Sequence, residues 1–442
     1  MVPEYLKTEC DVVIAGAGPT GTVAANTAAR QGMNVCLVEQ TAMLGGNGTS
    51  GLVTQIFGPK EHFGGIGVEV IDRLRERGGV GPTVEPGVYH WVPYRNEAMK
   101  LLWDDMVSEC EIDLYLCTRV VGVETTGRRI AAIGVAGPEG RFRIRGKTFI
   151  DATGDGFVSL MAGEECLVGD EEGRTQAPSM EAYYANVDFE EYRQFLHREE
   201  GNQVDIFHRY VATAVRDGVL REEDLHHPGA YEIGDRLALL NVGHVYGADC
   251  TTARGLTRAT LAARQLANRY FEFYKRYIPG FEDAQLVSTA SRLGIRESRR
   301  VLCRYMITYD DKKACRKFDD AVMRFEGGSR TDLHAASADR EDYEEYLRLF
   351  TVETAEPEPG DYCTLPYRVF VARENENLLV GGRCLSAERE TQATLRVLGY
   401  CMMMGQVIGT AAAGAVNENL PVGAIDVRRL QERLRKDGIE NV

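Results

Sequence analysis

The feature that most constrains the fold is the run Gly16-Ala17-Gly18-Pro19-Thr20-Gly21 near the start of the chain. It follows an apolar, β-branched run at 11–15 and opens an alanine-rich stretch at 20–31, which precedes a second apolar run at 34–38. This order predicts two parallel strands joined by a helix. In that setting Gly16 permits a tight turn, Gly18 lets the backbone approach a pyrophosphate, and Gly21 lets helix and strand pack closely.

An acidic residue, Glu39, stands at the end of the second predicted strand. Such an acid accepts hydrogen bonds from ribose hydroxyls and disfavours the 2′-phosphate of NADP. The free N–H groups at the start of the helix suit the pyrophosphate. An isolated glycine run is weak evidence and could be an ordinary turn, but strand, helix, second strand and acid agree here. The motif predicts dinucleotide binding without distinguishing NAD from FAD.

Three further glycine-rich stretches follow predicted strands or the acid, at 44–51, 150–156 and 380–383. A long ligand that touches several strand ends would need all of them. Between them, short strand-like runs over 113–145 predict an antiparallel meander, and 149–153 predicts a return to the parallel sheet. Helices are expected at 65–77, 96–110, 189–200, 205–216, 254–277 and 400–417.

Charge and composition narrow the class of partner. The chain has 66 acidic and 51 basic residues, a net charge of −15, which disfavours nonspecific binding to nucleic acid or an anionic membrane. No apolar run approaches the length of a membrane span, and we see no secretory signal before the first strand. We expect a cytoplasmic protein that binds a small-molecule substrate, with its electron acceptor and any homo-oligomer left open.

The eleven cysteines are scattered along the chain, and the closest pair in sequence is Cys110 and Cys117. The close C-x-x-C spacing that is typical of iron–sulfur ligation is therefore missing. We expect most thiols to be reduced and buried, and we predict no metal site.

Taken together, these segments resemble the FAD-dependent oxidoreductases of the glutathione-reductase-like fold, in particular the heterodisulfide-reductase-A-like group. The stretches 11–39, 44–53, 150–156, 294–300 and 381–414 carry the resemblance, which covers nearly the whole chain. It implies extended FAD, with the pyrophosphate on 16–21, the ribose on Glu39 and the adenine near Val120 or Val121. The remaining residues assigned to FAD are Gln40, Gly45, Gly46, Asn47, Thr49, Ala152, Thr153, Gly154, Gly382, Arg383, Arg396 and Val397.

The expected fold class is α/β. We predict a Rossmann-like FAD-binding domain, with a parallel sheet and an antiparallel meander, that is interrupted by an inserted α+β substrate domain. The predicted boundaries are 1–160 and 362–442 for the two parts of the FAD domain and 161–361 for the insert.

The helix predicted over 400–417 has two interpretations. In relatives the start of this helix faces the pyrimidine edge of the flavin, where N–H groups stabilise the negative charge of the reduced ring. Alternatively, Gly405, Gly409 and Ala413 permit close helix packing. Both interpretations can hold, because the small residues lie along the side of the helix, whereas the flavin would face its N-terminal end.

The residues assigned to catalysis are Arg389, Arg296 and His244. Where many relatives have a histidine, this chain has Arg389, which cannot act as a base but could clamp an anionic substrate; a salt bridge with Glu388 or Glu390 is the alternative. If 296–300 is a strand, Arg296 and Arg300 share one face, and a structural ion-pair network is favoured over a place for Arg296 beside the flavin or substrate.

Among the histidines, His244 lies in a glycine-rich patch at 241–247 and is the best candidate for a base. His62 and His90 follow it. A lone histidine is more often structural.

These observations predict an FAD-dependent oxidoreductase that transfers a hydride between flavin N5 and a small organic substrate, which the two arginines suggest is anionic. A flavin monooxygenase and a non-catalytic FAD electron-relay subunit of a larger complex are the alternatives.

Overall fold

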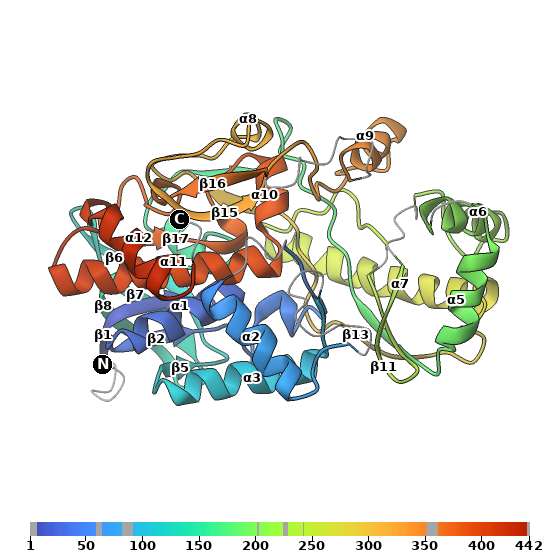
Figure 1. Ribbon diagram of the computed structural model, residues 1–442, viewed down its shortest axis with the longest axis horizontal. Helices are drawn as coiled ribbons and strands as arrows, with labels where there is room; N and C mark the ends of the chain where they lie inside the picture. Colours follow the sequence, from blue (N-terminus) through green and yellow to red (C-terminus); the bar gives the residue numbers. More distant parts are fainter. Residues whose placement is uncertain are drawn as a thin grey trace.

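The computed structural model describes residues 7–58, 64–81, 92–200, 203–223, 229–241, 243–350 and 361–439. Its largest sheet has the strand order β5-β2-β1-β8-β7-β6, and β17 also pairs with β8 (Figure 1). These strands are β1 (Lys7–Ala15), β2 (Val35–Val38), β5 (Asp113–Tyr115), β6 (Arg119–Thr126), β7 (Arg129–Gly137), β8 (Gly140–Asp151) and β17 (Leu378–Val380). The strands β5, β2, β1, β8 and β17 pair in parallel.

The predicted meander and the predicted return to the parallel sheet are both present, and the single strand β8 supplies both. The start of the predicted meander differs, because β5 pairs in parallel with β2. The first half of β8 pairs antiparallel with β7, from Arg145 back to Gly140, and its last residues, Phe149 to Asp151, pair in parallel with β17. Because β1 pairs along most of β8, one strand can serve both parts.

Helices cover one face of this sheet, where a large apolar core lies (Figure 1). The longest of them, α11, packs along α1, as the predicted close helix packing requires. The helices outside the second sheet are α1 (Pro19–Arg30), α2 (Gly65–Glu76), α3 (Asn96–Glu109), α4 (Phe157–Met161), α8 (Tyr309–Lys313), α9 (Arg340–Phe350), α10 (Arg389–Leu395), α11 (Leu398–Glu418) and α12 (Val427–Lys436).

A second sheet with the order β11-β12-β10-β13 stands to one side of the first, together with α5, α6 and α7 (Figure 1). It has apolar clusters of its own. Its elements are β10 (Ala182–Ala185), α5 (Phe189–Arg198), α6 (Gln203–Arg216), β11 (Ala230–Gly234), β12 (Leu237–Leu240), α7 (Ala253–Tyr277) and β13 (Gln285–Thr289). The α/β class, with a parallel sheet, a meander and a second α+β part, is confirmed.

Three small strand pairs complete the described structure, namely β3 (Gln55–Ile56) with β4 (Val92–Pro93), β9 (Cys166–Val168) with β14 (Arg299–Val301), and β15 (Ala321–Glu326) with β16 (Tyr362–Pro366). Val301 and Cys303 join the core beside the meander, and Ile307, Val322 and Phe325 join the core under α11. The predicted boundary at 361 stays a prediction, but this packing assigns much of 299–326 to the FAD-domain side.

Among the described helices, none alone is long and apolar enough to cross a membrane. α10 and α11 reach that length and hydropathy only together, and they meet at 89°.

Replacing Gly405 with valine should destabilise the protein. A Cβ at Gly405 would lie 2.8 Å from Val23 Cβ and still closer to the Thr20 carbonyl oxygen, so α11 would have to move away from α1. We expect a loss of about 2 kcal/mol or more in the free energy of unfolding, measured by denaturant titration.

Gly414→Ala is the matched control, because a Cβ there meets no atom within 4 Å. Helix propensity should then stabilise the protein by about 0.5–1 kcal/mol. Equal destabilisation by both variants would show that the α1–α11 contact is not the cause.

Candidate functional site

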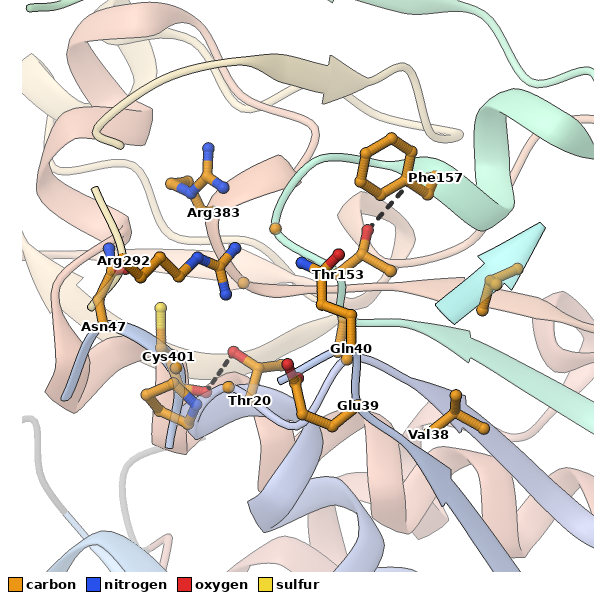
Figure 2. A pocket seen from close by; sticks show the side chains of 18 of the residues that line it. Thr20, Val38, Glu39, Gln40, Asn47, Thr153, Phe157, Arg292, Arg383 and Cys401 are labelled. Carbon is orange, nitrogen blue, oxygen red and sulfur yellow. Dashed lines mark hydrogen bonds between the residues drawn. The ribbon is translucent and has the colours of Figure 1, made fainter. Parts of the chain in front are cut away.

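A pocket opens where β1, β2 and β8 end in the large sheet (Figure 2). Of the residues predicted to bind FAD, those that line it are Gly16, Gly18, Pro19, Thr20, Glu39, Gln40, Gly46, Asn47, Val120, Ala152, Thr153, Gly154, Gly382, Arg383 and Arg396. The pocket therefore joins all four glycine-rich stretches, as a long ligand requires. Carboxyl ends of parallel strands are the usual ligand site of such sheets.

Five predicted residues do not line the pocket. Gly21, Gly45, Thr49 and Val397 support its walls, whereas the Val121 side chain is 42% exposed on β6 beside the pocket residue Val120. The pairing of β6 with β7 shifts register between Val120 and Gly122, so Val121 lies at an irregular point of the strand, and of the two valines only Val120 lines the pocket.

Sequence reasoning missed Val38, Thr118, Arg119, Phe157, Arg292, Leu398 and Cys401 in the pocket wall. Most of them are neighbours of predicted residues. Arg292 lies after β13 in a loop without a motif, so nothing local in the sequence identified it.

The glycines of the first turn have separate roles. Gly16 has a φ of +90°, which favours glycine, and a Cβ there would lie 2.7 Å from Thr153 Cα. A Cβ at Gly18, in contrast, meets no protein atom within 4 Å although Gly18 lines the pocket. Gly16 is therefore required by the protein's own packing, while the space at Gly18 is free for a ligand.

Glu39 is buried and held in place from both sides. The Ala17 N–H donates to its Oε2 at 2.8 Å, and the Thr41 N–H and hydroxyl donate to its Oε1 at 2.8 and 2.9 Å. Since a carboxylate offers about four lone-pair sites, acceptor capacity remains for ribose hydroxyls. The predicted role of Glu39 fits this geometry.

Arg292 and Arg383 lie on the side of the pocket opposite Glu39 and Gln40 (Figure 2). Arg383 donates to Asp155 at 2.6 Å and to Ser298 at 2.9 Å. Burial acts to raise the pKa of Asp155, but the guanidinium groups of Arg383 and Arg292 outweigh it and hold the pKa below its usual range. One carboxylate thus anchors two cations at the pocket wall.

The start of α11 forms the end of the pocket. Leu398 and Cys401 line it, and the Thr20 hydroxyl donates to the Cys401 carbonyl at 2.9 Å, which links the starts of α1 and α11 (Figure 2). Both helix N-termini therefore meet one pocket, and each favours negative charge. This arrangement suits a ligand with a pyrophosphate at one place and an electron-accepting ring at another.

The chain belongs to the FAD-dependent oxidoreductase family, whose model, described as FAD dependent oxidoreductase, matches residues 11–434. The protein is thus an FAD-dependent oxidoreductase, and FAD is its cofactor. The pocket fits this cofactor, because the space at Gly18, the acceptor Glu39 and the two helix N-termini correspond to its pyrophosphate, ribose and ring.

Among solved structures, the chain is similar to a geranylgeranyl bacteriochlorophyll reductase-like protein from Thermoplasma acidophilum, at 11% identity over 98% of this chain and 85% of that chain, with a TM-score of 0.50. It is also similar to a myxobacterial chondrochloren halogenase, at 13% identity over 97% of this chain and 79% of that chain, with a TM-score of 0.47. A third similar structure is p-nitrophenol 4-monooxygenase from Pseudomonas putida, at 12% identity over 96% of this chain and 83% of that chain, with a TM-score of 0.47. A search of curated proteins finds no match. At these identities the likeness to the first structure shows the fold alone.

The predicted strand over 296–300 is wrong in part, because only Arg299–Val301 forms β14. Glu297 lies before it, fully buried, within 3.3 Å of Arg300 and 3.2 Å of Arg389. The predicted structural ion-pair network is therefore present. Arg389 takes part in it, and Asp170 lies 3.9 Å from the same guanidinium. Its partner is neither Glu388 nor Glu390, since Glu388 accepts from the Tyr309 N–H instead.

Arg296, unlike Arg300 and Arg389, does not pair with Glu297. Its guanidinium is buried and donates to the Ala177 carbonyl at 2.6 Å, and the structure gives it no carboxylate within 4 Å among the described residues. Burial, and then the nearby Arg396, lower the pKa of Arg296 to about 10, so it stays cationic at neutral pH. Its backbone carbonyl accepts from Gln392, which also donates to the Arg383 carbonyl, so Arg296 is tied to the FAD cradle.

The three histidines considered as bases differ in where they lie. His244 is buried and its Nε2 lies 2.8 Å from Nδ1 of His334. It is thus not a lone histidine. His62 and His90 lie outside the described residues.

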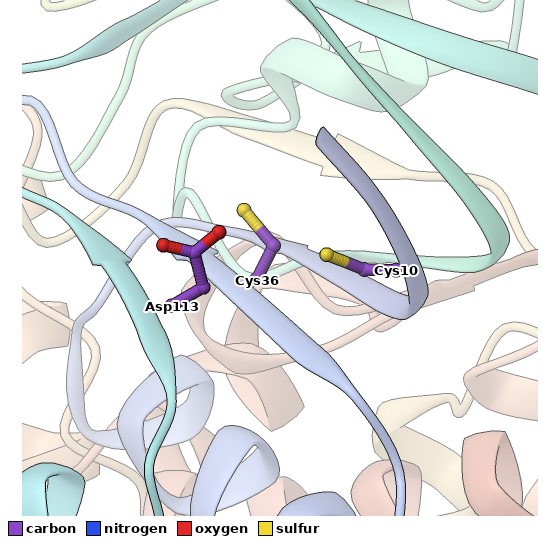
Figure 3. Close-up of side chains that lie close together, drawn as sticks. All are labelled: Cys10, Cys36 and Asp113. Carbon is purple, nitrogen blue, oxygen red and sulfur yellow. The ribbon is translucent and has the colours of Figure 1, made fainter. Parts of the chain in front are cut away.

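One group of possible metal ligands exists among the described residues, formed by Cys10, Cys36 and Asp113 on β1, β2 and β5 (Figure 3). Their ligand atoms lie within 4.8 Å of one another. The neighbouring Cys10 thiol, and then burial, raise the pKa of Cys36 well above its usual value. Since a protonated thiol is a poor ligand, this group does not change our prediction that no metal is bound.

Gly18→Val should yield folded but largely colourless protein. The valine side chain meets no protein atom within 4 Å at Cβ, so it enters the ligand space instead of the core. Flavin absorbance per protein after purification, together with the melting temperature, measures both effects. Gly122→Val on β6, also without a neighbour within 4 Å and outside the pocket, should stay yellow. A fully yellow Gly18→Val protein would contradict the pyrophosphate site.

Elemental analysis of the purified protein should find neither iron with acid-labile sulfide nor zinc in stoichiometric amounts. About four irons per chain would reveal a cluster that sequence spacing missed. About one zinc that is lost in Cys36→Ser would instead assign a site to the Cys10, Cys36 and Asp113 group.

Proposed function

We propose that the protein transfers a hydride between FAD and a small organic anion that binds beside Arg296. Bound FAD supplies the hydride acceptor or donor, and the protein supplies the site that orients the substrate. We also propose that the chain falls in the heterodisulfide-reductase-A-like group, which is narrower than the family that the match shows.

The observation that carries the proposal is the buried guanidinium of Arg296. A buried cation is costly unless it is paired. Glu297 pairs with both Arg300 and Arg389, and Asp332 pairs with Arg396 at 2.7 Å, whereas among the described residues the Arg296 guanidinium donates to a single backbone carbonyl. A substrate carboxylate would complete its pairing with a bidentate contact. Arg296 is thus a better anchor than Arg389, although both remain candidates.

Glu181 adds a second polar group on the same side. It is 3% exposed, and its Oε2 is buried with no hydrogen-bond partner among the described residues. Burial raises the pKa of Glu181 well above its usual value, and the charge of Arg296 offsets this only in part. Burial therefore favours the protonated form of Glu181. That form can donate a hydrogen bond to a carbonyl or hydroxyl oxygen of a substrate that Arg296 holds.

A flavin monooxygenase remains the first alternative, and an electron-relay subunit the second. The fold serves all three, so the fold does not choose between them. Anaerobic mixing separates them. In an enzyme of the proposed kind, a small organic substrate alone bleaches the FAD absorbance. In a relay subunit the absorbance is bleached only when a protein partner is present, and in a monooxygenase only when NAD(P)H is present.

The test uses small 2-hydroxy and 2-amino carboxylates, each paired with its uncharged methyl ester. At least one carboxylate should bleach the FAD absorbance anaerobically, and its ester should not. Arg296→Ala should weaken the apparent affinity for that carboxylate at least about tenfold, or about 1.4 kcal/mol, with FAD content unchanged.

Arg389→Ala is the comparison variant. It should leave Glu297 buried with one cation fewer, and so lower the melting temperature more than it changes bleaching. If Arg389→Ala abolishes bleaching at unchanged stability while Arg296→Ala has no effect, the anchor is Arg389. If no carboxylate bleaches the oxidised protein, and no 2-oxo or unsaturated carboxylate reoxidises the photoreduced protein anaerobically, hydride transfer with an organic anion is wrong.

A further inference from the structure

Four side chains form a continuous path through the region between the two sheets. Tyr246 Oη lies 3.1 Å from His244 Nδ1, His244 Nε2 lies 2.8 Å from His334 Nδ1, and His334 Nε2 lies 3.1 Å from Asp332 Oδ1. Both imidazoles are buried, and Tyr246 is half-buried against the aromatic cluster of α9.

The other end of the path reaches the FAD pocket. Arg396 lines the pocket and donates to Asp332 Oδ2 at 2.7 Å and to the Asp332 carbonyl at 2.8 Å. Asp332 is half-buried, and 32% of its side-chain surface is accessible. A carboxylate with accessible surface beside the pocket can exchange a proton with a small molecule or water.

The charges around Asp332 fix the positions of the protons. Burial acts to raise the pKa of Asp332, but Arg396 and His334 hold it well below its usual range, so Asp332 is an ion that only accepts. Burial, and then the charge of Arg296, lower the pKa of His334 to about 3, so its ring is neutral. A neutral imidazole has one N–H, which His334 must place on Nε2 to donate to Asp332.

The position of the His334 proton also decides which atom donates at each of the other hydrogen bonds of the path. His334 Nδ1 has no proton, so it accepts, and His244 must donate from Nε2. His244 Nδ1 lies 3.1 Å from the Tyr246 hydroxyl, and it accepts from that hydroxyl when it carries no proton. Every donor points the same way, from Tyr246 to Asp332.

We propose that Tyr246, His244 and His334 are a proton relay that supplies Asp332 at the edge of the FAD pocket. In one passage the Tyr246 O–H breaks and His244 Nδ1 gains that proton, His244 Nε2 gives its proton to His334 Nδ1, and His334 Nε2 gives its proton to Asp332. Water returns a proton to Tyr246 and is left as hydroxide. Both imidazoles then carry their proton on Nδ1 and must return it to Nε2 before the next passage. No electrons move, and one proton passes from water to Asp332.

The direction of the relay deepens the proposed function. Delivery of a proton to the pocket suits the reduction of a substrate carbonyl or activated alkene, in which a proton must accompany the hydride. That use of the proton rests on the proposed function. The relay itself does not, because it needs only the geometry and the bound FAD.

The first test reads the proton positions directly in the holoprotein. Nitrogen-15 NMR of labelled histidine should show the proton of His244 and of His334 on Nε2, and the His334 ring should stay neutral between about pH 6 and 8, where a free histidine would titrate. His334→Gln should change the His244 signals, while His208→Gln, which removes a histidine bonded to Tyr343 outside the path, should not. A His334 proton on Nδ1, or a cationic His334 at neutral pH, would overturn the assignment.

The second test measures proton flow without any substrate. Photoreduction of bound FAD draws protons from the medium, which a pH-indicator dye follows in time. Tyr246→Phe and His244→Gln should slow this uptake about tenfold or more, and His208→Gln should not. Unchanged uptake in both relay variants would show that the network is only structural. Because no substrate is added, failure of the proposed hydride transfer would leave this result readable.

Discussion

The close contact between α1 and α11 is the constraint on which the site depends. Gly405 and Gly409 let α11 approach Thr20 and Ala24 of α1 so closely that a Cβ at either glycine would overlap with α1. The Thr20 hydroxyl then bonds the Cys401 carbonyl in the first turn of α11. Helix starts that are about 380 residues apart in sequence thus face one ligand, which explains why the last quarter of the chain returns to the first sheet.

A second set of buried polar contacts ties this pocket to the region where a substrate would bind. Gln392 on α10 donates to the carbonyls of Arg296 and Arg383, and Glu297 holds Arg300 and Arg389 on the other side of the same segment. Buried charges of this kind add little net stability, but losing one partner is costly. We infer that this network keeps the Arg296 guanidinium in a fixed place relative to the FAD cradle.

The sequence predicts the local parts of this site well and the contacts between distant parts poorly. Glycine spacing and Glu39 predicted residues that line the pocket because the whole motif lies in one strand–helix–strand unit. Arg292, in contrast, comes from a loop without a pattern. The bond between His244 and His334 spans ninety residues, and the pairing of Arg389 with Glu297 spans ninety-two, so neither leaves a local signal. A single strand serving both meander and parallel sheet was missed for the same reason, since register is set by tertiary pairing.

The central claim is that one pocket, bounded by the starts of α1 and α11, binds FAD and places its ring beside Arg396 and the buried polar groups around Arg296. A crystal structure of the yellow protein tests this most directly. The account predicts ribose density at Glu39, pyrophosphate density at Gly18 and ring density between Asn47 and Leu398 at the start of α11. Ring density at Val120, or a cofactor bound outside this pocket, would contradict it.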